Sequence, residues 1–340
     1  MKKKDQGVSV AETTVITEEV VTEGGEMALQ EEHKHKKMSP FKSQRVKDYI
    51  FVISLIILPL TQFIIFWGFI NFDSFLMAFQ SPTREGFTTI NFKRFIFEWE
   101  QGNNFIQRAL LNTFIAFLVS NFICVPLVLI CSFLLFRKIY GYKAFRVIFY
   151  LPNMISGAVM AMMFKYLCYG DGPILSLAQS LGITVSEKII TNGLLWTEET
   201  AFTTIMCYNV WSSFGLNMIL YLGAMMRIPE EVLESARIDG IGLFGEFGKM
   251  VMPMIWPTVT TMIVLGLTGL FTWYGPIMVL TYGNHKTTTI GWYIIAKILN
   301  TSIYSYNYPA AVGMLCTVIS IPLVFGVKAI LDKITEAVEY

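Results

Sequence analysis

Residues 228–257, IPEEVLESARIDGIGLFGEFGKMVMPMIWP, form a charged segment between two apolar ones. Pro229 suits the first turn of a helix, and the acidic residues that follow suit the positive end of the helix dipole. Gly240 suits the end of that helix, because glycine adopts the left-handed conformation at little cost. The pattern predicts a short helix, a glycine turn and a second short helix that ends at Pro253 and Pro257, all lying against a membrane surface.

The composition indicates a membrane protein with several spans. Of the 340 residues, 54% are hydrophobic and 15% are charged, and the mean hydropathy is +0.53. This balance excludes an ordinary soluble domain. The net charge of +1 gives no indication of nucleic-acid binding. No pair of the five cysteines has C-x-x-C spacing, so we expect neither a disulfide nor a metal site.

Six apolar stretches are each long enough to cross a bilayer as a helix. They lie at about residues 49–70, 109–135, 147–167, 203–225, 257–280 and 310–330. The second contains Pro126, which predicts a tilt or kink. The fold class expected is therefore an all-α membrane protein with six transmembrane helices.

The basic residues predict the orientation of these helices. Most of the 26 Lys and Arg residues fall in the N-terminal tail, the 136–146 loop, the 228–257 segment and the C-terminal tail. An even number of spans puts these four segments on one side, and basic residues favour the cytoplasm. We therefore expect both termini and the 228–257 segment to be cytoplasmic in a multi-pass protein of the cell membrane.

The expected spans contain no Asp, Glu or His, and the chain has no G-x-x-x-x-G-K-[ST] phosphate-binding loop. Uphill transport would therefore need energy from another subunit. We find no Ser/His/Asp set and no cluster of metal ligands, so no catalytic, cofactor-binding or metal-binding residues are assigned and an enzyme is not expected.

The 228–257 segment resembles a known signature. Glu234-Ser235-Ala236, Asp239-Gly240 and the later Met250, Met252 and Pro253 are similar in type and spacing to the EAA motif of binding-protein-dependent ABC importer permeases. Ser235 replaces an alanine of the motif, and methionines replace its Ile and Leu. The flanking Asn209-x-Trp211 and Arg227-Ile-Pro229 resemble the carbohydrate branch (maltose and multiple-sugar type).

The resemblance implies a type I ABC importer permease fold with a cytoplasmic coupling helix. It implies that Glu234, Ser235, Ala236, Asp239 and Gly240 contact an ATPase subunit. The implied partners are a second, different permease, two ATP-binding subunits that hold ATP and Mg, and an extracytoplasmic solute-binding protein. This chain would bind no cofactor.

The domain boundaries that follow from this resemblance divide the chain into four parts. They are a disordered cytoplasmic tail (1–45), a first transmembrane helix with an outer loop (46–104), the permease domain (105–332) and a cytoplasmic tail (333–340).

The function implied is import of a carbohydrate, with an oligosaccharide as the expected cargo. Sugars bind to aromatic faces and hydrogen-bonding groups. Such groups gather in two stretches, and the candidates for the substrate path are Asn209, Trp211, Asn217, Thr272, Trp273 and Tyr274. Gly275-Pro276 predicts a helix break beside the second stretch.

Other interpretations stay open at this point. The same polar and aromatic residues also suit helix packing and the bilayer interface. The cargo could be an amino acid, a polyamine or phosphate, and a membrane scaffold that recruits a partner other than an ATPase is a further alternative.

Overall fold

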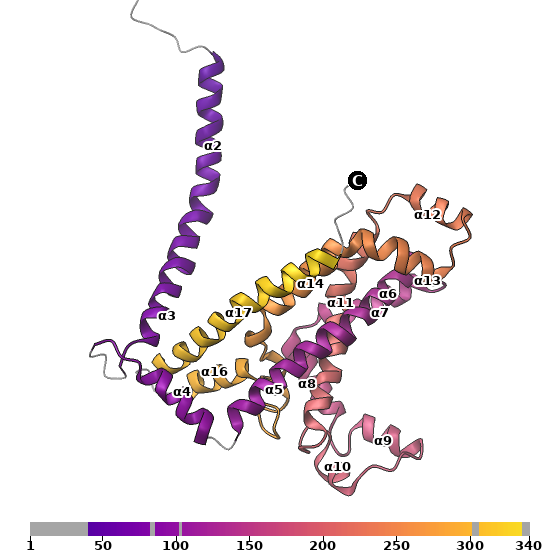
Figure 1. The fold of residues 1–340 in the computed structure, drawn as a ribbon. Coiled ribbons are helices and arrows are strands. Elements are labelled where there is room, and N and C mark those ends of the chain that lie inside the picture. The colour runs from indigo at the N-terminus through magenta and orange to yellow at the C-terminus, as the bar shows by residue number, and fades with distance from the viewer. Residues whose placement is uncertain (1–39, 82–85, 102–103, 301–305, 335–340) are drawn as a thin grey trace, which may run out of the picture. The chain divides into compact units, whose positions relative to one another are not determined.

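The computed structural model describes residues 40–81, 86–101, 104–300 and 306–334 (Figure 1). These residues are helical or in connections, and the described part contains no strand beyond an isolated bridge between Gln80 and Phe87. Most of the expected N-terminal tail and most of the expected C-terminal tail lie outside the described residues. The four-part division of the chain stays a prediction.

The chain divides into two compact units, residues 1–69 and 70–340. In the first unit, α2 (Pro40–Gln62) continues into the π-helical η1 (Phe63–Phe69). Nearly every side chain described there is exposed, although most are large and apolar. An apolar surface of this kind is typical of a helix that crosses a bilayer.

The second unit is a bundle of helices with short connections (Figure 1). In chain order its helices are α3 (Ile70–Ala78), α4 (Ile90–Gln101), α5 (Phe105–Leu118), η2 (Val119–Cys124), α6 (Val125–Phe136), α7 (Tyr142–Met154), α8 (Gly157–Leu167), α9 (Pro173–Ser180), α10 (Glu187–Asn192), α11 (Ala201–Met225), α12 (Glu230–Ile238), α13 (Leu243–Gly245), η3 (Glu246–Val251), α14 (Met252–Thr268), η4 (Leu270–Thr272), α15 (Gly275–Leu280), α16 (Ile290–Leu299) and α17 (Asn307–Ile334).

Four continuous helices of the described chain are long and apolar enough to cross a membrane. They are Gln44–Ala78, Phe105–Phe136, Leu243–Thr268 and Asn307–Ile334. A bent pair, Tyr142–Met154 with Gly157–Leu167, makes a fifth if it is one span. The remaining stretch expected from the sequence, 203–225, is the fourth in chain order and corresponds to the 25-residue helix α11. Its composition is more polar than that of the helices named above. The all-helical membrane fold is as predicted, and the number six is consistent with it.

The expected single helix over 147–167 is wrong in one respect, because α7 and α8 meet at an angle of 103°. Ile155 between them has an extended backbone, with φ −96° and ψ 146°. Pro152 lies in the last turn of α7, and its missing N–H removes one hydrogen bond from that turn.

The expected helix over 257–280 is also interrupted, and earlier than predicted. α14 ends at Thr268, and Trp273 is extended before α15 begins. Gly275-Pro276 does not end a helix here but starts α15, with proline in the first turn where its missing N–H costs little.

The second short helix expected from the sequence does not end at Pro253 and Pro257. The chain stays helical from Leu243 to Thr268, through the π-helical η3. Pro253 stands in the first turn of α14 and Pro257 one turn later. Neither proline can donate a backbone hydrogen bond. The wider π-helical turns of η3 come just before these prolines and allow the helix to continue.

The largest cluster of buried apolar side chains joins several helices of the bundle. Buried apolar side chains of α6, α11, α12, η3 and α14 pack together in it, including Leu129, Met218, Leu233, Val251 and Ile255. Residues 230–251 therefore pack against the other helices of the bundle.

Candidate functional site

A cavity of about 390 Å³ lies within the bundle. Its walls come from α5, η2 and the start of α6 on one side, from α11 on another, and from α14, η4 and Trp273 on a third. The residues that line it are Thr113, Ala116, Phe117, Ser120, Asn121, Cys124, Val125, Asn209, Ser213, Asn217, Tyr221, Met262, Leu265, Gly266, Gly269, Leu270 and Trp273.

Helix α11 supplies a row of four polar side chains to this cavity: Asn209, Ser213, Asn217 and Tyr221. We call this row the α11 ladder. Residues four apart in a helix lie on nearly the same face, one turn above another, so regular spacing produces the row. The ladder runs along the cavity wall and offers amide and hydroxyl groups over three helical turns.

Hydrogen bonds hold the N-terminal part of the ladder in place. The Asn209 side-chain amide donates to the Ser120 hydroxyl at 3.0 Å, which joins α11 to η2. The Ser213 hydroxyl donates to the Asn209 carbonyl at 2.6 Å, and the Asn217 amide donates to the Ser213 carbonyl at 3.0 Å. These bonds use the amide nitrogens and leave the amide oxygens of Asn209 and Asn217 as acceptors in the cavity wall.

Tyr221, at the C-terminal end of the ladder, was not among the residues expected from the sequence. Its side chain is fully buried, and its hydroxyl has no hydrogen-bond partner in the described part of the chain. A buried polar group without a partner destabilises a fold, so this hydroxyl beside the cavity is a candidate for binding a ligand. The spacing of 209, 213, 217 and 221 was the signal that could have identified it.

The cavity wall is uncharged, since the lining residues include no Asp, Glu, Lys, Arg or His. It combines one tryptophan, Trp273, with hydroxyl and amide groups. An indole ring can bind the C–H face of a sugar, while the hydroxyl and amide groups match the sugar's own hydroxyls. A charged ligand would lose its hydration here without a counter-charge from this chain.

The structure brings Asn209, Asn217 and Trp273 together at this cavity and places the other three candidates elsewhere. Trp211 borders a separate apolar hollow with Phe202 and Phe214. Its ring lies 6.2 Å from that of Phe164, centroid to centroid, which is a packing contact. Trp211 therefore lies outside the cavity.

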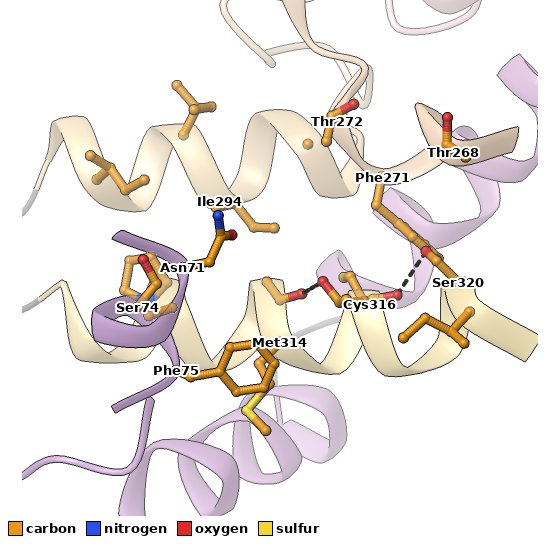
Figure 2. A pocket seen from close by; sticks show the side chains of 18 of the residues that line it. Asn71, Ser74, Phe75, Thr268, Phe271, Thr272, Ile294, Met314, Cys316 and Ser320 are labelled. Carbon is orange, nitrogen blue, oxygen red and sulfur yellow. Dashed lines mark hydrogen bonds between the residues drawn. The ribbon is translucent and has the colours of Figure 1, made fainter. Parts of the chain in front are cut away.

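Thr272 and Tyr274 border a third hollow, of about 710 Å³, between α3, α16, α17 and η4 (Figure 2). Its serine and threonine hydroxyls donate to neighbouring backbone carbonyls. Thr272 donates to the Gly269 carbonyl at 3.0 Å, and Ser320 donates to the Cys316 carbonyl at 2.8 Å. Figure 2 shows rings and aliphatic side chains around them, among them Phe75, Phe271 and Met314. This hollow offers few free donors to a sugar.

Helix α12 carries the residues expected to contact an ATPase. Leu233 and Ala236 are buried against the bundle, whereas Glu234, Ser235 and Asp239 are exposed. The helix is therefore amphipathic, and Ala236 belongs to its inner face. The outer face of α12 exposes the carboxylates of Glu230, Glu231 and Glu234, and exposed Asp239 follows directly after the helix.

Gly240 ends α12 in the left-handed conformation, with φ +74°. The Ile241 N–H donates to the Ala236 carbonyl at 3.1 Å, which closes the helix end. A side chain at this position would be strained by the backbone alone, because no other atom lies within 4 Å of an added Cβ. The turn lets the chain reverse into α13.

A polar cluster at the other end of the bundle joins α4, α16 and α17. The Glu98 carboxylate accepts hydrogen bonds from Tyr293 and Tyr308 and pairs with Arg94 and Lys297. Burial raises the pKa of the Glu98 carboxyl, but the two tyrosine hydrogen bonds and the two positive charges outweigh burial, so the pKa is lowered from 4.5. The only sequence signal for this cluster was the four-residue spacing of Arg94 and Glu98.

Comparison with known proteins gives a family and a fold. The family model described as "Binding-protein-dependent transport system inner membrane component" matches residues 124–336. AmyD of Thermoanaerobacterium thermosulfurigenes, a probable starch degradation products transport system permease protein, is 26% identical over 208 residues, which cover 60% of this chain and 66% of AmyD. MsmF of Streptococcus mutans serotype c, a multiple sugar-binding transport system permease protein, is 27% identical over 193 residues, which cover 56% of this chain and 64% of MsmF.

These matches span slightly less than two thirds of the length of AmyD and of MsmF. One solved structure is a bacterial alginate ABC transporter in complex with an alginate pentasaccharide-bound periplasmic protein. A chain of it superposes with a TM-score of 0.72 and 23% sequence identity, covering 86% of this chain and 98% of that chain. The arrangement of helices described above is therefore shared with an ABC transporter.

Proposed function

The chain belongs to the family of binding-protein-dependent transport system inner membrane components, as the 228–257 motif predicted, and from this membership we propose that it is a carbohydrate-translocating permease subunit of an ATP-driven importer. A member of this family is a multi-pass membrane protein and a transport subunit, not an enzyme. The names of AmyD and MsmF support a sugar cargo, with an oligosaccharide as the specific expectation.

The observation that carries the proposal is the uncharged cavity with the α11 ladder and Trp273. Its groups complement a neutral, hydroxyl-rich molecule. Phosphate or a polyamine would require opposite charges, which this wall does not contain. An amino acid would need partners for both its ammonium and its carboxylate group. Sugar import is therefore favoured over the other cargoes.

The exposed carboxylates of α12 support docking to an ATP-binding subunit. In the proposed assembly, two such subunits hold ATP and Mg, a second permease completes the path, and an extracytoplasmic binding protein delivers the sugar. Glu234, Ser235 and Asp239 would contact the ATPase, Gly240 would shape the turn, and Ala236 would seat the helix on its own bundle.

The proposed orientation places both termini and α12 in the cytoplasm. The basic 136–146 loop supports it, because Arg137 at the start of this loop contacts Glu246 of η3. The loop and the coupling segment thus lie at one end of the bundle, which is where basic residues are favoured if that end is cytoplasmic.

The test is uptake by the complete transporter, purified from native membranes and reconstituted in vesicles with ATP inside and the binding protein outside. We expect accumulation of a neutral oligosaccharide. Accumulation of an amino acid, polyamine or phosphate in place of every neutral sugar would overturn the proposed cargo. A complex that contains no ATPase would overturn the transport role and favour the scaffold alternative.

A further inference from the structure

Glu246 is a carboxylate buried at the end of the bundle that carries α12. Its side chain is 1% exposed, and its Oε2 lies 3.0 Å from Nη1 of Arg137. Arg137 is the residue that ends α6, and its own side chain is about three-quarters buried. The pair therefore joins two helices that are more than 100 residues apart in the sequence, at a point largely shielded from water.

Apolar contacts surround this pair and join the same elements. The rings of Phe133 in α6 and Phe247 in η3 lie 5.0 Å apart, centroid to centroid. Leu233 of α12 and Val251 of η3 belong to the same buried cluster as Phe133. The coupling helix, η3 and the end of α6 are thus packed as one body around a central ion pair.

Both helices that meet at the pair lead to the cavity. Upstream of Arg137, the chain runs back through α6 to η2, whose Ser120 and Asn121 line the cavity. Downstream of Glu246, it runs through η3 into α14, whose Met262 and Leu265 line another wall. A displacement at the pair can therefore reach two cavity walls through continuous helices.

We propose that the Arg137–Glu246 ion pair is the contact that transmits movement of α12 to α6, and so to the η2 wall of the cavity. Both are positioning residues for transport. The inference rests on the proposed function, since it assumes that α12 is moved by an ATPase partner.

The chemistry of the pair supports transmission over packing alone. A buried ion pair gives little net stability, because both groups lose their hydration, and an apolar pair of similar volume would stabilise the fold at least as well. What the charges add is an attraction that resists separation of the two helices, since separation leaves a buried charge alone. Such a contact makes the two helices move together.

The experiment measures ATP hydrolysed per sugar imported by the complete transporter in vesicles. Glu246→Gln keeps the size of the side chain and removes its charge. We expect the complex to assemble and hydrolyse ATP, but the ratio of ATP to sugar to rise at least about fivefold, the lower end of typical couplings between sites. Lys138→Gln is the matched control, because it removes an exposed charge from the same loop without touching the pair.

A second variant separates transmission from folding. Arg137→Met/Glu246→Leu replaces the pair by apolar groups, so we expect wild-type thermal stability with a raised ratio. A ratio that returns to the wild-type value together with stability would overturn the inference, as would a wild-type ratio in Glu246→Gln. Sugar import by the wild type and by Lys138→Gln tests the proposed function separately. If both import sugar and Glu246→Gln has a normal ratio of ATP to sugar, the proposed function stands and only the role of the ion pair is overturned.

Discussion

The Tyr221 hydroxyl is the polar group of the α11 ladder that has no hydrogen-bond partner in the described part of the chain. A buried hydroxyl that lacks a partner in the described structure lowers stability unless something else provides a hydrogen bond. The other members of the α11 ladder are anchored to backbone or to Ser120. In the proposed function, the Tyr221 hydroxyl would bind the sugar.

Tyr221→Phe is therefore expected to separate stability from transport. Removing the hydroxyl should raise the free energy of unfolding of the detergent-purified complex by about 1 kcal/mol, because an unsatisfied buried group is lost. The half-saturating sugar concentration for uptake should rise about threefold to tenfold, through loss of one hydrogen bond. Tyr208→Phe is the control, because Tyr208 is buried in the same helix but lies outside the cavity. Reduced stability with unchanged uptake would contradict a ligand role for Tyr221.

Gly240 and Gly242 offer a matched pair for testing the turn after α12. Neither has an atom within 4 Å of an added Cβ, but Gly240 has φ +74° and Gly242 has φ −71°. Gly240→Ala should strain the turn by about 1–2 kcal/mol and weaken ATPase binding in a pull-down, whereas Gly242→Ala should not. Equal effects of the two substitutions would show that the left-handed turn does not matter.

The residue-scale signals in the sequence were uneven. The spaced motif at 234–240 led to the family, because its residues are local in the chain. Asn209, Asn217 and Trp273 were found by their chemistry. Chemistry alone could not tell them from Trp211, Thr272 and Tyr274. Trp211 lies on another face of α11, and the breaks after α14 bring Thr272 and Tyr274 to a different hollow.

At the scale of elements, α12 is the surface that distinguishes a transport subunit from a scaffold. Glu234→Lys reverses a charge on its exposed face and leaves the buried face intact. We expect normal membrane insertion, with loss of ATPase binding or of the link between hydrolysis and uptake. Glu187→Lys on α10, which also reverses an exposed acid on a short helix, is the control. Normal uptake and normal ATPase recruitment in Glu234→Lys would remove the docking role of Glu234.

The Glu98 cluster should make the attachment of α4 sensitive to acid. The pKa of Glu98 is lowered in the folded protein, so its contribution to stability is fully present above pH 4.5 and is lost as the pH falls through the lowered value. The difference in melting temperature between wild type and Glu98→Gln should therefore be constant near neutral pH and shrink in acid. The exposed Glu100→Gln should show no such difference. A difference that grows on acidification would contradict the sign of this pKa shift.

The helices that the sequence placed correctly are those with long, uninterrupted apolar runs, such as α17. The errors concern where helices are interrupted: the breaks at Ile155 and after Thr268 were not predicted, and the end predicted at Pro253 and Pro257 does not occur. Both sides of each break are apolar, so hydropathy alone does not locate the break. The bend of 103° between α7 and α8 depends on packing against α11 and α15, which the sequence does not display.

At the scale of the whole molecule, the coupling segment and the cavity belong to one packed body. The core cluster runs from Leu233 of α12 through α6 and α11 to Val259 of α14, and α6, α11 and α14 also line the cavity. In the proposed function, this continuity would give an ATPase bound at α12 a physical route to a sugar in the bundle. Hydropathy predicted the all-helical membrane fold and the spaced motif predicted the family, whereas neither could predict this continuity. The need for an external ATPase, inferred from missing motifs, stays a prediction.

The most direct test of the central claim is to purify this subunit in mild detergent from its native membrane, identify the attached proteins and assay ATP hydrolysis with a sugar-loaded binding protein. We predict recovery of a second permease and an ATP-binding subunit, with hydrolysis stimulated by the loaded binding protein. Recovery of the chain alone, or of partners without an ATPase even after crosslinking, would contradict its role as an importer subunit.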